Sequence, residues 1–455
     1  MNKVVFEGVC RDLTNEGKGI VEYKGATVFV PNLLVGEKAS IELVNKVSNI
    51  FYGKVVKLIE KSKDRVNPPC PYYKDCGGCN LQHIDYKKQL EFKKQQVINA
   101  YKKVAGMNVV ALDTIGMDTP YKYRNKVQLP VSSFKKKTIL GFYKENTHDV
   151  VAINSCLLQD DISNTIMNKV KDLLNAMHIE AYNEDTRKGY IRHILIKRGF
   201  VSNETMLVLV TNTDSFPGRG QLVDRIKKEM PYINTIVQNI NSRKTTVILS
   251  NKEKVLYGKG YIIDELMGLK FKISAQSFYQ INHEQTEKLY SKAIEMAKLS
   301  NKDVVLDAYC GVGTIGMSLA KHVKEVIGVE IVEDAIKDAK ENARLNNLKN
   351  VKYYCADASE FMKRMVVDKY KPDVVFVDPP RAGCDKKFLE SLVYLKPKKI
   401  VYISCNVATQ ARDVKFLVEK GYKYSEVQPV DMFPNTYHVE SVVVLSRKDA
   451  KNDQK

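Results

Sequence analysis

The stretch DAYCGVGTIG, residues 307–316, decides the fold of the C-terminal part of the chain. It follows an apolar run and precedes a helical pattern, and Gly311, Gly313 and Gly316 have the spacing G-x-G-x-x-G. Glycines at this spacing let a strand turn tightly into a helix beside a bound nucleotide. Glu330 ends the next apolar run, at the distance of about 20 residues where a carboxylate binds a ribose. We therefore predict a nucleotide-binding pocket.

Five apolar runs separated by helical patterns surround this stretch: DVVLDAYC, KEVIGVE, VKYYCAD, PDVVFVDPP and KKIVYISC. Continuous apolar strands that alternate with helices are typical of a parallel sheet covered on both faces. We predict a Rossmann-like α/β domain over residues 286–455.

Acidic residues follow two more of these runs. Asp357 ends the third run, where a carboxylate can accept the amino group of an adenine, and Asp378-Pro379-Pro380 ends the fourth. The prolines fix the backbone around Asp378, and nucleobase methyltransferases place such a loop beside the target base. The glycine pattern alone fits NAD, FAD or S-adenosylmethionine, and these acids favour the last. Each single acid has a helix N-cap as its alternative role.

A cysteine ends the fifth run, in KKIVYISCN, residues 398–406. A thiolate that adds to carbon 6 of a uracil makes carbon 5 reactive toward a methyl donor, and a base must then remove the carbon 5 proton. We predict Cys405 as the nucleophile and Glu440 as the base. Cys384 is the alternative nucleophile, and His438 is the alternative base.

The first 285 residues read as two further regions. Residues 1–60 alternate short apolar and polar stretches with glycine turns, which predicts a small β-barrel. Residues 61–285 are mixed: 85–104 form a basic amphipathic helical pattern with Leu90, Val97, Ile98 and Tyr101 on its apolar side. Strand-like runs cover 190–199, 204–212, 232–240 and 244–251.

Cys70, Cys76 and Cys79 lie within ten residues, and Cys156 is a candidate fourth thiolate. Four thiolates suit an iron–sulfur cluster or a structural zinc ion. Three clustered cysteines plus a distant one favour the cluster over zinc, and a chance grouping of free thiols is the third interpretation.

The net charge of +19, from 72 Lys and Arg against 53 Asp and Glu, indicates a polyanionic partner such as nucleic acid. The alternative is a surface charged for solubility. Basic stretches at 54–65, 87–94 and 135–137 are candidates for phosphate contacts. No apolar run approaches the ~18 residues of a membrane helix, and the N-terminus has no signal-peptide pattern. These observations predict a cytoplasmic protein without membrane contact.

The blocks EGKGIVEYKGATVFVPNLLVGEKASIELV, CPYYKDCGGCNLQHIDYKKQL, YRNKVQL, AQSFYQIN, DAYCGVGTIG, FVDPPRAG, YISCNVATQARD and DMFPNTYHVE occur in this order. Together they resemble the bacterial RNA uracil-5-methyltransferases, most closely the 23S rRNA (uracil-5-)-methyltransferases of the RumA/RlmD group. The resemblance covers nearly the whole chain. It implies a TRAM domain, which is an OB-like RNA-binding barrel, at the N-terminus.

The resemblance also implies roles for single residues. Cys405 would be the nucleophile and Glu440 the base. A [4Fe–4S] cluster would be held by Cys70, Cys76, Cys79 and Cys156. The S-adenosylmethionine site would be lined by Gln276, Tyr309, Thr314, Glu330, Asp357 and Asp378. Tyr309 stands where many members have Phe, and Thr314 where Asn is common.

We therefore expect three domains: a TRAM-like barrel at 1–60, a central α+β domain with the cysteine cluster at 61–285, and the methyltransferase domain at 286–455. The expected activity is methylation of carbon 5 of a uridine in 23S rRNA, since tRNA-specific relatives generally lack the barrel and the cluster. No obligate protein partner is expected. The alternatives are the same chemistry on tRNA, methylation of an exocyclic base nitrogen, a non-catalytic RNA-binding or redox-sensing protein and, more distantly, a dinucleotide-dependent oxidoreductase.

Overall fold

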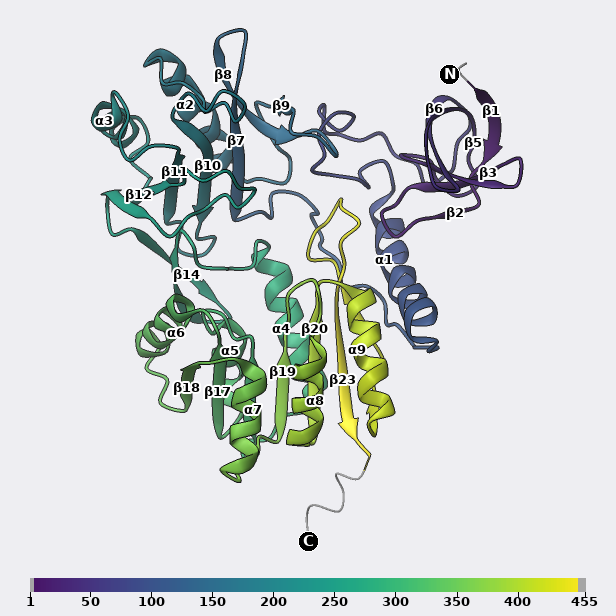
Figure 1. Ribbon diagram of the computed structural model, residues 1–455, viewed down its shortest axis with the longest axis vertical. Coiled ribbons are helices and arrows are strands. Elements are labelled where there is room, and N and C mark those ends of the chain that lie inside the picture. The colour runs from purple at the N-terminus through teal and green to yellow at the C-terminus, as the bar shows by residue number, and fades with distance from the viewer. Residues whose placement is uncertain (1–3, 449–455) are drawn as a thin grey trace.

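The computed structural model describes residues 4–448, which form three large sheets and a two-stranded ribbon (Figure 1). The C-terminal sheet contains the glycine stretch. The carboxyl ends of its parallel strands point toward the N-terminal and central sheets (Figure 1). The predicted pocket therefore lies at the edge where the three parts of the chain meet.

The N-terminal sheet has six strands, as the short apolar runs of residues 1–60 predict. In spatial order they are β1 (Val5–Val9), β5 (Lys38–Val47), β6 (Ile50–Glu60), β4 (Ala26–Val30), β3 (Gly19–Tyr23) and β2 (Asp12–Leu13). Gly8 of β1 also packs directly against Val21 of β3, so that the sheet curls around one apolar core.

The central sheet has seven strands. In spatial order they are β13 (Glu253–Tyr257), β12 (Thr235–Ile240), β11 (Thr205–Thr211), β10 (Ile191–Arg198), β7 (Lys126–Phe134), β8 (Lys137–Tyr143) and β9 (Val150–Ala152). Helices α2 (Asp161–Ala176) and α3 (Arg219–Glu229) cover one face. The other face shares a continuous apolar core with the ribbon β14 (Tyr261–Leu266) and β15 (Leu269–Ser274) and with the C-terminal sheet.

Three of the four strands predicted for the central region are confirmed as β10, β11 and β12, but the strand predicted at 244–251 is wrong. Here buried asparagine side chains bond the backbone. Asn241 Nδ2 donates to the carbonyl oxygens of Val247 and Ile248, and Asn239 Nδ2 to that of Ser250. Side-chain bonds of this kind compete with strand pairing, and β13 begins only at Glu253.

The C-terminal sheet has the predicted parallel order. Its strands are β18 (Val351–Cys355), β17 (Glu325–Glu330), β16 (Val304–Ala308), β19 (Val374–Val377) and β20 (Lys399–Ser404), followed by the antiparallel β23 (Glu440–Arg447), with β21 (Tyr422–Tyr424) and β22 (Gln428–Val430) paired to it. One face packs on α4 (His283–Ala297), α5 (Thr314–Leu319), η2 (Ala320–His322) and α6 (Glu333–Leu345). The other packs on α7 (Ala358–Val367), α8 (Lys386–Leu395) and α9 (Val407–Glu419).

Helix α1 (Tyr86–Ala100), with its continuation η1 (Tyr101–Ala105), packs beside α9 on the C-terminal sheet, although its sequence lies in the predicted central region. Its buried face matches the predicted apolar side only in part. Val97 and Tyr101 are buried as expected, but Gln89, Lys93 and Gln96 are buried with them, while Leu90 and Ile98 are only half-buried. Hydrogen-bond partners from other segments explain this polar burial, as described below.

Among the described residues, no helix is both long enough and apolar enough to cross a membrane.

Packing between β17 and β18 leaves no room for a side chain at Gly328. A Cβ atom there would overlap the ring of Tyr353 and lie 3.0 Å from Cys310 Sγ. We expect Gly328→Ala to lower the free energy of unfolding by about 1 to 3 kcal/mol through overpacking. The control is Gly220→Ala in α3, where a Cβ meets nothing within 4 Å and stability should rise by about 0.5 to 1 kcal/mol. Urea titrations measure both, and equal effects would contradict the packing.

Candidate active site

The glycine stretch forms the predicted tight connection from β16 to α5. Gly311 and Gly313 have φ angles of +54° and +88°, which glycine adopts without strain. A Cβ at Gly316 would lie 2.9 Å from Asp307 Oδ2 and 3.1 Å from Val326 Cγ1, so that this glycine permits close approach of helix and strand. The Gly316 N–H donates to Asp307 Oδ2 at 2.8 Å.

Two of the predicted cofactor acids organise loops at the same edge. Glu330 Oε2 accepts the Gly311 N–H at 3.2 Å, and its Oε1 accepts those of Ile331 and Val332. Asp357 caps α7 by accepting the Glu360 N–H at 3.0 Å. The N-cap role considered for Asp357 is therefore present, and its carboxylate is partly exposed at the carboxyl end of β18.

The remaining predicted cofactor residues are spread more widely. Tyr309 has a φ of +65° and stacks on Phe388 with ring centroids 5.0 Å apart. Thr314 begins α5, and its hydroxyl lies 3.2 Å from the Tyr290 hydroxyl. Gln276 is exposed in the loop after β15, where its side chain helps to lower the pKa of Glu253 against the effect of burial.

The proposed nucleophile and base lie on neighbouring strands. The antiparallel pairing of β20 and β23 places Ser404 opposite Ser441, so the next position sets Cys405 opposite Glu440. β22 also pairs Glu440 with Val430, which holds the backbone of Glu440 from its other side. Asp378 follows β19, which is the other neighbour of β20.

Cys405 opens onto a cavity of about 270 Å³. The cavity lies between the C-terminal sheet, α1 and the loop that joins β2 to β3. It is lined by Asn15, Glu16, Gln96, Ala100, Arg381, Cys405, Asn406, Val407, Ala408, Tyr437, His438 and Val439. Asn15 is tied to α1, because its carbonyl oxygen accepts a hydrogen bond from Gln96. The N-terminal sheet thus contributes to the wall of the cavity.

Burial raises the pKa of every acid of this site. Burial raises the pKa of Cys405 to about 11, with Glu440 and Asp378 adding to the rise and Arg381 opposing it. Burial also raises the pKa of Glu440 to about 8 and that of Asp378 to about 7. Asp307 is a further member, since burial raises its pKa to about 8. A positive charge bound among these groups would favour their ionised forms.

The structure places the two rival residues differently. Cys384 is buried in the core beneath α8 and α9, with its Sγ 3.5 Å from the Tyr402 hydroxyl, and does not line the cavity. His438 does line it, but burial lowers the pKa of His438 to about 4. That low pKa makes His438 a weak proton acceptor, but Glu440 is not among the residues that line the cavity. The choice between the two bases stays a prediction.

The four cysteines of the predicted cluster gather in one region without forming a metal site. Cys79 and Cys156 contact the same small apolar cluster, and Cys79 interacts electrostatically with Cys156 and Cys76, as Cys76 does with Cys70. Within residues 4–448, however, no three His, Cys, Asp or Glu side chains are arranged to hold a metal ion. An iron–sulfur cluster is therefore not shown.

Sequence reasoning missed several cavity residues. Arg381 was visible as the residue after Asp378-Pro379-Pro380, and its charge acts on both Cys405 and Glu440. Asn15 and Glu16 carried no signal, because only the packing of the N-terminal sheet against α1 brings them to the cavity.

A family model described as tRNA (Uracil-5-)-methyltransferase matches residues 85–448 of the chain. Two curated relatives are 46% identical. They are uncharacterized RNA methyltransferases of Staphylococcus aureus strain MSSA476, aligned over 97% of this chain and 98% of its own length, and of Staphylococcus epidermidis strain ATCC 12228, aligned over 98% of each.

Among solved structures, the chain is similar to the Pyrococcus abyssi tRNA (uracil-54, C5)-methyltransferase in complex with S-adenosyl-L-homocysteine. The identity is 29% and the TM-score 0.77, with 97% of this chain and 100% of that chain covered. The likeness therefore extends over all three sheets.

The charges around Cys405 predict opposite effects of two substitutions on its titration. Glu440 is ionised at the high pH where the thiol titrates, so Glu440→Gln should lower the pKa of Cys405 by about one unit, and Arg381→Gln should raise it. The pH profile of iodoacetamide alkylation, read by mass spectrometry of the peptide that contains Cys405, measures the midpoint. Exposed Cys355 is the internal control. Shifts in the same direction for both variants would contradict this arrangement.

Proposed function

We propose that this chain, which belongs to the tRNA/RNA (uracil-5-)-methyltransferase family, methylates carbon 5 of a uridine in 23S rRNA, with Cys405 as the nucleophile and Glu440 as the base. The proposal rests chiefly on the pairing of β20 with β23, which brings these two residues to adjacent positions. The family assignment establishes an S-adenosylmethionine-dependent RNA methyltransferase, and the finer assignments belong to the proposal.

The residues at the edge of the C-terminal sheet fit S-adenosylmethionine. The backbone at Gly311 faces open space, with nothing within 4 Å of a Cβ position. Asp307 Oδ1 is buried and has no hydrogen-bond partner among the described residues. We assign the cofactor site to Gln276, Tyr309, Thr314, Glu330, Asp357 and Asp378. When bound, the cofactor supplies a methyl group and a positively charged sulfur.

The chemistry of this chain's own residues follows from their order along the edge. Cys405 loses its proton, and the thiolate adds to carbon 6 of the uracil, which makes carbon 5 nucleophilic. After carbon 5 has taken the methyl group, Glu440 removes the carbon 5 proton and the bond between carbon 6 and sulfur breaks, which restores the thiolate. Once ionised beside a positive charge, a carboxylate with the raised pKa of Glu440 is a stronger base than an ordinary one.

A groove of about 580 Å³ supports an RNA substrate. It adjoins the Cys405 cavity at Glu16, Tyr437 and His438 and extends past the cysteine loop. Four cations line it together with acidic residues; they are Lys18, Lys74, Arg124 and Lys144. Phosphates next to the target uridine would follow this groove. Of the predicted phosphate-binding stretches, 54–65 and 135–137 stay candidates, but Lys93 within 87–94 is fully buried and cannot contact RNA.

The RNA class has one specific alternative. The N-terminal sheet and the cysteines suggested rRNA, but the Pyrococcus abyssi tRNA enzyme matches 97% of this chain, including the N-terminal sheet. The N-terminal sheet therefore does not separate rRNA from tRNA enzymes. Methylation of a tRNA uridine by the same residues is the second candidate function, and the first experiment below distinguishes the two.

The experiment offers 23S rRNA transcripts and tRNA transcripts, each containing 5-fluorouridine, together with S-adenosylmethionine. Fluorine at carbon 5 cannot leave as a proton, so the reaction should stall with RNA covalently bonded to the enzyme. We expect a shifted band on a denaturing gel that Cys405→Ala abolishes and Cys384→Ala retains. Glu440→Gln should trap unmodified uridine RNA in the same way and slow turnover by about 100-fold or more.

The outcomes distinguish between the RNA classes and between the two chemical routes. An adduct with 23S rRNA alone supports the proposal, and an adduct with tRNA alone replaces it with the second candidate. Product without any adduct would show direct transfer, for example to an exocyclic nitrogen, and would remove Cys405 from the mechanism.

We also propose that residues 1–60 are a TRAM-like RNA-binding module and that Cys70, Cys76, Cys79 and Cys156 hold a [4Fe–4S] cluster. The electrostatic contacts among the four thiols support the cluster, which requires that the thiols draw closer than they lie in this structure.

Protein purified without oxygen should contain about four iron atoms per chain and absorb visible light. Cys76→Ser should lose both, whereas Cys355→Ser, which changes an exposed cysteine on β18, should lose neither. Zinc in place of iron would indicate a structural zinc site, and wild-type protein without metal would refute the cluster.

A further inference from the structure

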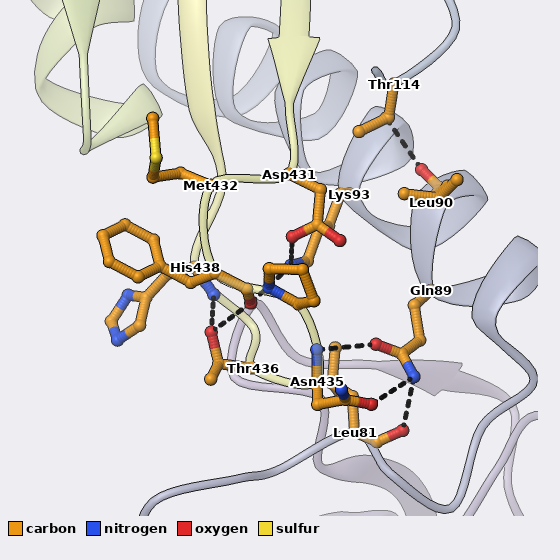
Figure 2. A network of polar contacts seen from close by, with 12 residues as sticks. Leu81, Gln89, Leu90, Lys93, Thr114, Asp431, Met432, Asn435, Thr436 and His438 are labelled. Atoms are coloured by element: carbon orange, nitrogen blue, oxygen red, sulfur yellow. Dashed lines mark hydrogen bonds and ion pairs between the residues drawn. The ribbon is translucent and has the colours of Figure 1, made fainter. Parts of the chain in front are cut away.

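The segment 431–439 connects β22 to β23 and belongs to neither strand. Tyr437 and His438 of this segment line the Cys405 cavity, and Glu440 follows it directly. Its position is therefore set by contacts with other segments, and Figure 2 shows that helix α1 makes many of them.

The central contact is an ion pair between Lys93 and Asp431, whose side chains are both completely buried (Figure 2). Lys93 Nζ donates to Asp431 Oδ1 and, at 3.1 Å, to the carbonyl oxygen of Phe433. Tyr86, about two turns earlier on α1, donates its hydroxyl to Asp431 Oδ2 at 2.8 Å. Both oxygens of the carboxylate are thus occupied by α1.

A second contact fixes the middle of the segment. The Asn435 N–H donates to Gln89 Oε1 at 3.1 Å, and Gln89 Nε2 donates back to Asn435 Oδ1 at 3.3 Å and to the Leu81 carbonyl oxygen at 3.1 Å (Figure 2). Asn435 has a φ of +68°, a left-handed conformation that its surroundings must hold. Gln89 and Lys93 lie one turn apart on α1, so one face of the helix grips two points of the segment.

Because the ion pair between Lys93 and Asp431 is buried, it favours one position of the segment 431–439 against α1. A buried charge is tolerated only when it is paired and hydrogen-bonded, so any displacement of the segment from α1 would leave Lys93 or Asp431 alone in an apolar setting. Burial lowers the pKa of Lys93, and Asp431 opposes that effect. A buried pair of this kind adds little net stability but disfavours alternative positions of the loop.

We propose that Lys93 is a positioning residue for methyl transfer: through Asp431 and Phe433 it holds the segment 431–439 so that Glu440 faces carbon 5 of the target uridine. The inference rests on the proposed function. Lys93 contacts neither the glycine stretch nor Glu330, so its loss should spare cofactor binding and thiolate addition and should slow the removal of the carbon 5 proton.

The test compares Lys93→Met with Lys227→Met, which removes a lysine from an exposed helical ion pair on α3. The first measurement is hydrogen–deuterium exchange and needs no RNA. We expect Lys93→Met to speed exchange of amides 431–439 by roughly tenfold or more, and to leave β16 to β20 unchanged. Lys227→Met should leave both regions as in the wild type.

The second measurement uses the RNA that the wild type modifies. Lys93→Met should form the 5-fluorouridine adduct and bind S-adenosylmethionine within about twofold of the wild type. On unmodified uridine RNA its turnover should fall by about 100-fold, since a small misplacement of a catalytic group has such an effect, and the methylated covalent adduct should accumulate. A purely structural role would not produce that adduct.

Two results would overturn the proposal. One is a folded Lys93→Met protein whose turnover is within about twofold of the wild type. The other is an unchanged rate of amide exchange at residues 431–439 in that variant. If Lys93→Met does not fold, the double variant Lys93→Met with Asp431→Leu replaces the pair by apolar side chains and restores burial without charge. Rapid exchange and adduct accumulation in the double variant support the proposal, and wild-type turnover refutes it. If the wild type forms no adduct with any RNA, the proposed function fails, while the exchange measurement still decides whether Lys93 holds the segment.

Discussion

The antiparallel register of β23 against β20 is the constraint on which the site depends. In a parallel sheet, only residues that follow the strands reach the carboxyl edge. The first residue of a parallel strand lies at the opposite edge. Because β23 runs the opposite way, its first residue, Glu440, arrives at the edge where β20 delivers Cys405. The same reversal sends the preceding segment across the top of the sheet, where α1 and the N-terminal sheet meet it. One inserted strand thus joins the three parts of the chain at one place.

The electrostatics of the edge follow from this crowding. Asp307, Asp378 and Glu440 come from three strands and share a buried environment in which Arg381 is the cation that acts on both Glu440 and Cys405. Burial of several acids without matching cations is unfavourable in the ligand-free state. When a cationic cofactor binds, its positive charge favours the ionised forms of these acids. The ionised acids then attract the cofactor.

The sequence predicted the C-terminal sheet well because each of its parallel strands is a continuous apolar run that ends in a polar turn. Cys405 and Asp378 lie at the predicted edge for that reason, and Glu440 reaches it as the first residue of the antiparallel β23. Their roles stay predictions. Local patterns failed where distant partners decide the outcome. Lys93 looks like a solvent-exposed helical lysine until Asp431, 338 residues away, is placed beside it. Residues 244–251 have the pattern of a strand, but the buried side chains of Asn239 and Asn241 form hydrogen bonds with their backbone carbonyls. The cysteine cluster stays a prediction, since among the described residues no three such side chains are arranged to hold a metal ion.

The long separation between α1 and its partners has a consequence for biosynthesis. The N-terminal sheet and the central sheet contain all their strands within the first 257 residues and can form while the ribosome is still translating. Helix α1 cannot, because the residues that satisfy Lys93 and Gln89 are among the last to be made. Until then these polar side chains remain in water and the helix stays undocked. The Cys405 cavity is therefore closed in a late step of folding, after translation has passed Asn435. A truncated chain would contain both earlier sheets without this cavity.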